Sequence, residues 1–500
     1  MDWSRRLREG YTWTGAVDSE KVIHGLETKT QIDEECSTLK ENRLKHLVTL
    51  LALFCFIAAL CLLNSVNGPN VDATSTYGQT TAWVLFVVSL VPYLSLPMSL
   101  ANCLGLVLYN PYDRKKSSRI RVSSAPFLCF RTVTKGDLPH FVVGNAIQNR
   151  DICLRMGLGN FVVEIVTDNP VNVPKVEKHI HETVVPKDYV TKHGTRFKAR
   201  ALNYCLENHV NHLAVNDWIV HLDEETILTE ESIEGVVHFV TEGAADIGQG
   251  PISYASGHVV QNWVTTLADS IRLALDYSLF RFQFSYLHKP IFGFKGSYIV
   301  VRNKVEMDVG LDLGPKGSIA EDCFFALKAM ERGYTFDFIT GQMRENSTFT
   351  LMDFIKQRRR WFIGQLYTVL GVDTAALNKS GLILSLTCSV LMPISLSNLI
   401  ISLFLPFQRH VIFNLLTGFI GGSFWFLYAF GAFLSFSDRN WSYVRRFLVC
   451  LACCTCVMPV AATLESVAVY WGLLTINSNE FFVVQKDLCK TVKESQVKVM

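Results

Sequence analysis

The 500-residue sequence lacks a strong net charge, a disulfide pattern and internal repeats, and each absence excludes a class of protein. With 47 basic and 45 acidic residues the formal net charge is only +2, so we expect no nucleic-acid partner. The 14 cysteines do not make a disulfide framework, and many fall inside apolar runs. A long polar stretch precedes the first apolar run, which argues against a cleaved secretory signal.

The apolar sequence is instead concentrated at the two ends of the chain. Hydrophobic residues make up 49% of the sequence, more than in an ordinary soluble protein. Five apolar runs are each long enough to cross a hydrocarbon core of about 30 Å as a helix. They cover residues 46–63, 82–108, 381–405, 411–436 and 447–474. We therefore expect an N-terminal segment 1–45, two transmembrane helices within 46–108, a globular domain over 111–375, three transmembrane helices within 381–474 and a tail 475–500.

The distribution of lysine and arginine predicts how this chain sits in a membrane. Basic residues are frequent before the first run and again over residues 114–121, whereas the loop 64–80 has none. By the positive-inside rule the N-terminal segment and the globular domain are cytosolic. Five crossings would place the tail after residue 475 on the opposite side.

Two groups of possible metal ligands have simpler interpretations, whereas one carboxylate inside an apolar run does not. Four cysteines between residues 450 and 456 have a zinc-like spacing, but no histidine is near, so we interpret them as packing residues. His179 and His181 have no third ligand nearby and are interpreted as solvated strand residues. Glu465 is a carboxylate inside an apolar run, which makes it a functional candidate whose partner the sequence does not name.

Between residues 111 and 375 the sequence alternates β-rich runs with helical stretches, which is typical of a mostly parallel α/β sheet. Asp168 directly follows the strand expected at 161–167, and Asp223 follows the strand expected at 217–222. Because ligands bind at the carboxyl ends of strands in open α/β sheets, we expect both carboxylates at one edge. Further strands are expected over 127–134, 183–185, 246–254 and 298–302, and helices at about 262–286, 321–333 and 353–370.

Three short strings carry the candidate chemistry. In the first, Asp223 and Glu225 stand two residues apart and can both reach one Mn²⁺ or Mg²⁺ ion; the alternative is an acidic turn that caps the next helix. In the second, Asp322 follows Glu321 at a helix start, as a general base or as a simple helix-dipole partner.

The third string, Gln357-Arg358-Arg359-Arg360-Trp361, begins an amphipathic helix. Gln357 and Arg360 offer an amide and a cation to a diphosphate, and Trp361 offers an aromatic face to a sugar ring. The alternative is a membrane-border helix with snorkelling arginines, and Arg358 and Arg359 fit that description better.

In this order the strings resemble glycosyltransferase family 2, whose members are inverting enzymes with a GT-A (Rossmann-like) α/β fold. The resemblance covers about 125–370 and includes the segment with Lys198 and Ala201-Leu202-Asn203; Glu225 departs from the usual second aspartate. The runs HLDEET, GQGPISY and KQRRRWF are closest to Egghead-type invertebrate β-1,4-mannosyltransferases.

That resemblance implies an inverting hexosyltransferase, a β-1,4-mannosyltransferase that moves one mannose from GDP-mannose to glucosylceramide in glycosphingolipid biosynthesis. Its cytosolic domain would work in the Golgi or endoplasmic reticulum membrane, with membrane lipids around it. Asp322 would be the catalytic base; Asp168, Lys198, Asp223, Gln357 and Arg360 would bind the donor; and Gly296, Glu321 and Trp361 would bind the acceptor. Two alternatives stay open: a processive family 2 polysaccharide synthase that uses a UDP-sugar, and a non-catalytic membrane protein.

Overall fold

The computed structural model of the chain describes residues 12–66, 71–113, 122–174, 177–255, 260–437, 439 and 441–476. The basic residues at 1–11 and 114–121, and the tail from residue 477 onward, lie outside the described residues. The chain divides into two compact units, one of residues 1–52 with 110–113 and one of residues 53–109 with 114–500. In the first unit the expected segment 1–45 contributes the start of a long helix, α2 (Thr12–Val66), which continues into the second unit.

A seven-stranded sheet forms the centre of the second unit, and the strand order is β3-β2-β1-β4-β7-β5-β8. Neighbouring strands are parallel except at β7, which runs antiparallel to both β4 and β5. The sheet is therefore mostly parallel, as the sequence predicted, and β7 is an antiparallel strand between β4 and β5. The strands are β1 (Leu128–Thr134), β2 (Phe161–Thr167), β3 (Ile180–Val184), β4 (Trp218–Leu222), β5 (Ile247–Gln249), β7 (Ile299–Arg302) and β8 (Phe336–Phe338), and β6 (Ile252–Ser253) pairs with β9 (Met343–Arg344) in a small second sheet.

Helices flank this sheet and complete a GT-A-like α/β domain, as the sequence predicted. The long stretch expected at 262–286 is one nearly continuous helical segment with a π-helical turn in its middle. The helical elements of the domain are η2 (Val122–Ser124), α6 (Pro139–Arg155), α7 (Phe197–Tyr204), α8 (Glu230–Glu242), α9 (Trp263–Leu275), η3 (Asp276–Phe280), α10 (Arg281–Ser285), α11 (Asn303–Val309), α12 (Gly314–Gly317), α13 (Glu321–Glu331) and α14 (Leu351–Gly371).

Five helices among the described residues are long and apolar enough to cross a membrane: Ser37–Ser65, Gln79–Leu108, Ala376–Phe404, Val411–Ser435 and Tyr443–Leu474. The chain is thus a multi-pass membrane protein. These helices comprise the second half of α2, then α4 (Gln79–Leu90), η1 (Val91–Ser95), α5 (Leu96–Leu108), α15 (Ala376–Phe404), α16 (Val411–Ser435), α17 (Tyr443–Ala452), η4 (Cys453–Val457) and α18 (Met458–Leu474); the short α3 (Ala73–Tyr77) precedes α4.

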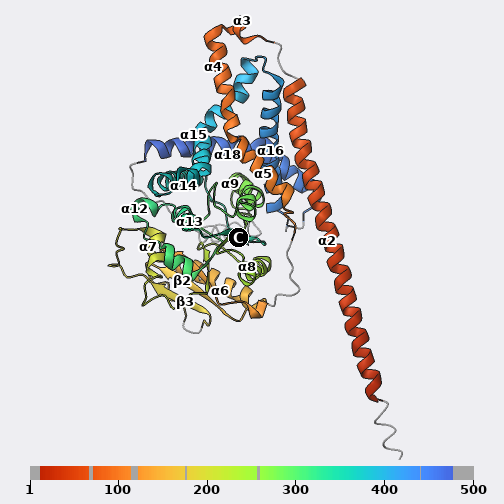
Figure 1. Cartoon of the computed structure of the whole chain (residues 1–500), viewed down its shortest axis with the longest axis vertical. Coiled ribbons are helices and arrows are strands. Elements are labelled where there is room, and N and C mark those ends of the chain that lie inside the picture. The colour runs from red at the N-terminus through yellow and green to blue at the C-terminus, as the bar shows by residue number, and fades with distance from the viewer. Residues whose placement is uncertain are drawn as a thin grey trace, which may run out of the picture. The chain divides into compact units, whose positions relative to one another are not determined.

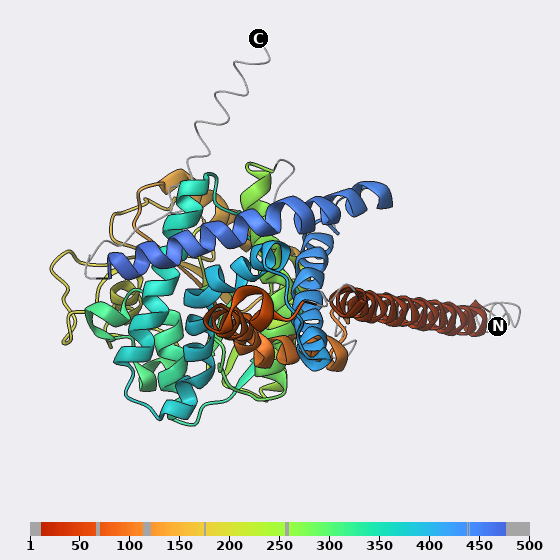
Figure 2. The same ribbon diagram turned by 90° about the horizontal axis from the view of Figure 1, so that it is seen from above.

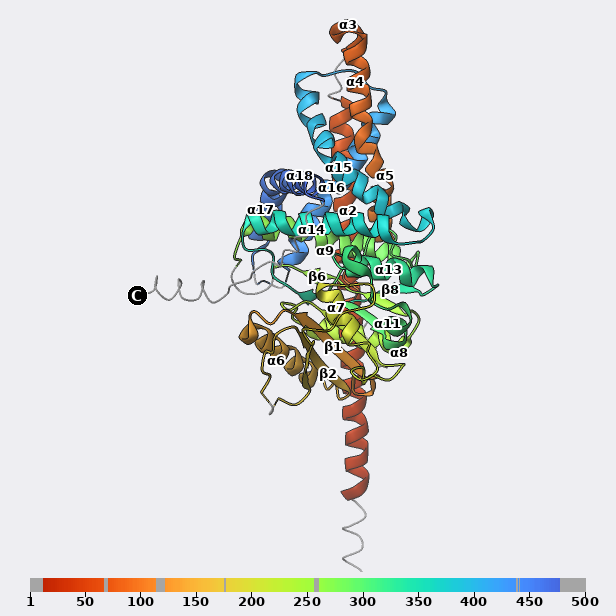
Figure 3. The same cartoon turned by 90° about the vertical axis from the view of Figure 1, so that its left-hand side faces the viewer.

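Within the second unit the apolar helices and the sheet lie on opposite sides of α14. Figure 1 shows α4, α15 and α16 on one side of α14 and the strands β2 and β3 on the other, and Figure 3 shows the same order from the side. The helix that carries the third sequence string therefore lies at the junction between the α/β domain and the apolar helices.

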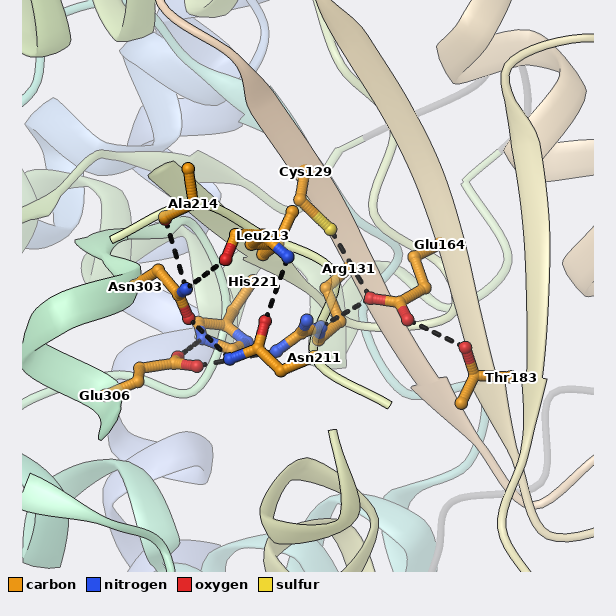
Figure 4. A network of polar contacts seen from close by, with 10 residues as sticks. All are labelled: Cys129, Arg131, Glu164, Thr183, Asn211, Leu213, Ala214, His221, Asn303 and Glu306. Carbon is orange, nitrogen blue, oxygen red and sulfur yellow. Dashed lines mark hydrogen bonds and ion pairs between the residues drawn. The ribbon is translucent and has the colours of Figure 1, made fainter. Parts of the chain in front are cut away.

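A buried polar network holds the central strands in place, and Figure 4 shows its members. Arg131 on β1 donates from Nε to Glu164 Oε2 on β2 at 2.7 Å, and its Nη1 lies 3.5 Å from Glu306 Oε2 on α11. Glu306 in turn pairs with His221 Nε2 on β4. Burial by itself raises the pKa of Glu164, but the Arg131 charge and a hydrogen bond from Thr183 outweigh it and hold the pKa below its usual value. These contacts connect β4 to β1, β2 and α11 and hold in place the strand whose end carries the first acidic string.

Candidate active site

The acidic string Asp223-Glu224-Glu225 lies in the turn directly after β4, at the carboxyl end of that strand. All five residues of β4 are buried because the strand lies inside the sheet, between β1 and β7. The Asp223 amide donates to Thr226 Oγ1 at 3.1 Å and to Ser297 Oγ at 3.3 Å. Thr226 Oγ1 donates to the buried Glu345 Oε1 at 2.7 Å. The backbone of the turn is thus held, while the Asp223 side chain remains 43% exposed.

The next helix does not need this string as a cap. It begins at Glu230, and Thr229 and Ser232 cap it with a reciprocal capping box. The alternative interpretation of the acidic string, as a helix cap, therefore has no support in this structure.

Lys198 on α7 connects the first string to the rest of the site. Its Nζ donates to Asp223 Oδ1 at 2.7 Å and to the Gly296 carbonyl oxygen at 2.8 Å, and it lies 3.8 Å from Glu321 Oε1. Burial by itself lowers the pKa of Lys198, but the charges of Asp223, Glu321 and Asp322 outweigh it and raise the pKa above its usual value. The amine is therefore a fixed positive charge among carboxylates.

Asp322 lies in the first turn of α13, close to this cluster. Its Oδ1 accepts a hydrogen bond from the Cys323 amide at 2.7 Å, and a Cβ added to Gly296 would lie 3.1 Å from its Oδ2. Burial and the neighbouring Glu321 charge raise the pKa of Asp322 from 3.8 to about 7. A carboxylate with a pKa near the working pH is suited to take a proton from a hydroxyl group. Asp322 also lies where the helix dipole favours a negative charge, but the dipole would lower the pKa of the carboxyl group rather than raise it.

Asp168 follows β2 and lies at the same edge of the sheet as Asp223, because β2 and β4 are both parallel neighbours of β1. Arg200 on α7 donates from Nη2 to Asp168 Oδ1 at 2.6 Å, and the Asp168 side chain is 39% exposed. Helix α7 therefore contacts both edge carboxylates, Asp168 through Arg200 and Asp223 through Lys198.

Helix α14 packs directly on the start of α13. A Cβ added to Gly364 would lie only 2.6 Å from the Ala320 Cβ, so the two backbones meet where no side chain intervenes. This close approach brings the helix that carries Gln357, Arg360 and Trp361 to the residues that precede Asp322.

The structure corrects the interpretation of Arg358 and Arg359 as snorkelling border residues. They are 8% and 5% exposed. Arg358 pairs through Nη2 with Asp269 on α9 and through Nε with Glu465 Oε1 on α18 at 3.2 Å. Arg359 donates from Nε to Thr475 Oγ1 at 2.9 Å. Both arginines are buried because α9 and α18 pack on this face of α14 and supply their hydrogen-bond and ionic partners. Arg358 is thus the partner of Glu465 that the sequence did not name.

Two guanidinium groups contact the ring of Trp361, which remains partly exposed. The Cζ atoms of Arg272 and Arg358 each lie 4.3 Å from its ring centroid, and Arg272 also lies 4.1 Å from the ring of Tyr254. Gln357 Oε1 accepts a hydrogen bond from Arg358 at 3.0 Å. Sequence reasoning missed Arg272, which no motif marks, and gave no role to Tyr254, the last residue of the run GQGPISY. The packing of α9 against α14 brings Arg272 to Trp361.

Two other expectations concern metal ligands. Asp223 and Glu225 offer hard oxygen donors on a partly exposed turn, which suits an ion that keeps several waters and substrate oxygens. Among the residues that the structure describes, no group of three or more histidine, cysteine, aspartate or glutamate side chains can hold a metal ion. His179 instead stacks on Phe161, with ring centroids 4.7 Å apart.

The chain is similar to known glycosyltransferases. Residues 218–476 match the family described as "Glycosyl transferase family group 2". The β-1,4-mannosyltransferase egh of Drosophila melanogaster is 43% identical over 442 residues, which cover 88% of this chain and 96% of the fly protein. The β-1,4-mannosyltransferase bre-3 of Caenorhabditis elegans is 41% identical over 446 residues, covering 89% of this chain and 97% of the nematode protein. A solved structure of S. aureus TarS, residues 1–349, aligns with 71% of this chain and 93% of its own at 10% identity and a TM-score of 0.29, a score too low to establish a shared fold.

The sequence resemblance is therefore confirmed at the level of the family. The match covers more than half of the chain, it contains Asp223, Asp322 and Trp361, and the two relatives align with it over nearly their whole lengths. The chain belongs to glycosyl transferase family group 2.

Proposed function

We propose that this protein is a β-1,4-mannosyltransferase that transfers a single mannose from GDP-mannose to the glucose of glucosylceramide, with inversion at the anomeric carbon. The relatives named β-1,4-mannosyltransferase, at 43% and 41% identity over most of the chain, support the reaction class. The proposal goes further than the reaction class by naming the donor and the acceptor. For this reaction the site must supply a general base and residues that bind the sugar nucleotide at the edge of the sheet.

The observation that carries the proposal is the cluster around Asp322. A carboxylate whose pKa is raised to about 7 lies beside a protonated lysine that is tied to Asp223 at the end of β4. In the proposed reaction Asp322 removes the proton from the acceptor hydroxyl as its oxygen bonds to C1 of mannose. The bond from C1 to the diphosphate oxygen breaks on the opposite face, and GDP leaves.

The remaining residues divide between donor and acceptor. We assign Asp168 and the loop Thr134–Asp137 to the nucleoside, because both lie at the edge where β1 and β2 end. Gln357 and Arg360 on α14, with Lys198, are assigned to the diphosphate. Trp361, Gly296 and Glu321 are assigned to the acceptor.

The loop that carries Gly296 is a fixed wall of this site. Gln249 Nε2 donates to the Lys295 carbonyl oxygen at 2.9 Å, Lys295 Nζ donates to Asp276 Oδ2 at 2.6 Å, and Gln283 holds the Gly293 carbonyl oxygen at 2.9 Å. An acceptor sugar placed against Gly296 would therefore meet a preformed surface.

We propose that Asp223 and Glu225 hold Mn²⁺ or Mg²⁺. When bound, such an ion neutralises charge on the leaving diphosphate. Removal of divalent cations by a chelator should abolish transfer, and Mn²⁺ or Mg²⁺ should restore it; full activity in the chelator would contradict this part. We further propose that the domain is cytosolic, at a Golgi or endoplasmic reticulum membrane, which suits a sugar nucleotide donor and a membrane-borne acceptor.

The direct test incubates the full-length protein in detergent with glucosylceramide and either GDP-mannose or UDP-glucose, and weighs the lipid product. Addition of one hexose from GDP-mannose alone supports the proposal. A ladder of products would indicate a processive synthase, and transfer from UDP-glucose would change the donor. Absence of transfer and of sugar-nucleotide hydrolysis would favour a non-catalytic protein. The Asp322→Asn variant distinguishes the site's own activity from that of a contaminating enzyme.

A further inference from the structure

The fifth apolar helix, Tyr443–Leu474, runs in a different direction from α4 and α16. Figure 1 shows α4 and α16 along the long axis of the view, whereas α18 crosses it. Figure 2, seen from above, shows the α17–η4–α18 helix extended across the catalytic domain, and Figure 3 shows α18 almost end-on. Its 32 residues correspond to about 48 Å at 1.5 Å per residue, well beyond the roughly 30 Å of a hydrocarbon core. We call this element the surface helix.

The first end of the surface helix contacts the catalytic domain. Just before it, Arg439 Nη2 donates to the Ala255 carbonyl oxygen at 3.4 Å. The Trp441 ring lies 6.2 Å from the ring of Trp263, the first residue of α9, and 5.1 Å from that of Phe436.

The last end contacts the same domain. Thr475 Oγ1 accepts a hydrogen bond from Arg359 on α14 at 2.9 Å, and Tyr367 on α14 donates to the Ile476 carbonyl oxygen. A Cβ added to Gly472 would lie 3.1 Å from the Phe362 ring. A transmembrane helix has its ends on opposite sides of the bilayer, but both ends of this helix contact α9 or α14 of one domain.

Between its ends the surface helix stays on the catalytic domain. Near its middle, Cys453 Sγ lies 3.7 Å from the Leu267 carbonyl oxygen on α9. Further along, Glu465 pairs with Arg358. The side that faces the domain thus contacts it near the middle and near the last end, and the sulfur atoms of Cys453 and Cys454 also lie 3.7 Å from backbone oxygens of α16.

The opposite side is apolar and exposed. The most exposed of its side chains are Tyr443 at 86% and Leu474 at 85%, one at each end. At the first end Arg445 stacks on Trp441, with its Cζ 4.1 Å from the ring centroid. An exposed apolar face with tryptophan and arginine at its border is the chemistry of a helix that lies in a membrane surface. The other exposed large apolar residues of this face are Val444, Phe447, Leu448, Leu451, Val460 and Val467; Tyr470 is partly exposed too, but its hydroxyl donates to the Val390 carbonyl oxygen of α15 at 3.1 Å.

The composition of the tail agrees independently. Residues 475–500 contain four lysines, whereas the loop 64–80 contains no lysine or arginine and the loop 405–410 contains one arginine. By the positive-inside rule the tail belongs with the catalytic domain, which an odd number of crossings would not allow.

We propose that Tyr443–Leu474 lies flat in the membrane–water interface on the catalytic side, with its exposed apolar face in the acyl chains of the bilayer. The chain then crosses the membrane four times, and its C-terminus returns to the side of the active site. The partner of this face is the lipid surface itself, and the surface helix holds α14, through Glu465 and Thr475, at the level of the lipid headgroups.

The test of this topology uses the full-length chain made with microsomes and a glycosylation acceptor sequence appended after Met500. A matched control carries the same sequence inserted in the loop 64–80. We expect glycosylation of the loop reporter and none of the C-terminal reporter. Glycosylation at the C-terminus would overturn the proposal.

A second measurement tests the orientation directly and does not depend on the reporters. Single cysteines at Leu448, Val460 and Val467 carry a fluorophore in the reconstituted protein, and lipids with quenchers at known depths report how deep each lies. Similar, shallow depths at all three positions support the surface helix. A series of depths that passes through the bilayer midplane would overturn it, and so would no quenching at any position, because the face would then contact something other than lipid.

Discussion

Replacing Asp322 by asparagine should remove activity and stabilise the fold at the same time. Asparagine keeps the size of the side chain and can still accept the hydrogen bond from the Cys323 amide, but it cannot take a proton. A positioned base contributes about 10²- to 10⁴-fold to the rate, or roughly 2.7 to 5.5 kcal/mol of barrier at 1.36 kcal/mol per tenfold. We therefore expect kcat to fall by two to four orders of magnitude with little change in donor affinity.

The gain in stability follows from the raised pKa. The rise from 3.8 to about 7 corresponds to about 4 kcal/mol at 1.36 kcal/mol per pKa unit. Because the folded pKa lies above the unfolded one, protonated Asp322 favours the folded state at low pH, and this contribution is lost as the pH rises through about 7. At pH 8 the buried charge therefore destabilises the fold, and Asp322→Asn should relieve up to that amount. The gain should be smaller at pH 5, where Asp322 is already protonated.

Two assays check both parts. Transfer rates from pH 5 to 9 should show the unmodified enzyme losing about tenfold in rate near pH 6 relative to its plateau, and thermal unfolding in detergent at pH 8 and pH 5 should show the variant more stable, chiefly at pH 8. Glu331→Gln, an exposed carboxylate at the other end of α13, is the matched control and should change neither. A normal kcat in the Asp322→Asn variant would refute the assignment of Asp322 as the general base. A lower melting temperature of the variant at pH 8 would refute the claim that the ionised Asp322 destabilises the fold.

Three other changes test separate parts of the structure. Arg131→Met removes the cation shared by two buried carboxylates, so the free energy of unfolding should fall by about 3 to 5 kcal/mol; a loss below about 1 kcal/mol in denaturant unfolding would contradict this. Gly364→Leu should push α14 away from Ala320 and lower kcat at least tenfold, whereas Gly371→Ala, at the exposed end of the same helix, should not; equal effects on transfer rate would argue against the contact. Glu465→Gln leaves Arg358 one ionised partner and should lower the melting temperature, by a loss of about 1 to 3 kcal/mol; an unchanged melting temperature would show that this ion pair adds nothing.

The central strands could be predicted from the sequence because they are buried on both faces. Strand β2 was predicted with the bounds that the structure shows, Phe161–Thr167, since a short continuous run of apolar and β-branched residues is typical of a strand inside a sheet. The three-residue strand β8 was missed because so short a run carries no periodicity. The antiparallel direction of β7 depends on its partners β4 and β5, and no local pattern encodes it.

The candidate site divides in the same way. The order of the three strings predicted the family, and the structure brings Lys198, Asp223 and Asp322 together; the roles assigned to them stay predictions. The burial of Arg358 could not be foreseen, because its partners Asp269 and Glu465 stand 89 and 107 residues away in the chain. An arginine in a basic run near apolar helices is typical of a membrane border, and only tertiary packing shows otherwise.

The pairing of Arg358 has a consequence for how the protein is made. One of its carboxylate partners, Glu465, lies in α18, the last helix of the described residues, and is therefore synthesised late. In a chain truncated before residue 465, Arg358 would lose Glu465 and keep Asp269. The face of α14 that α18 normally covers would also be exposed. The helix that carries the third string would then be fixed only after synthesis of the whole polypeptide. The candidate active site would therefore reach its final geometry only after α18 has been synthesised and has packed on α14.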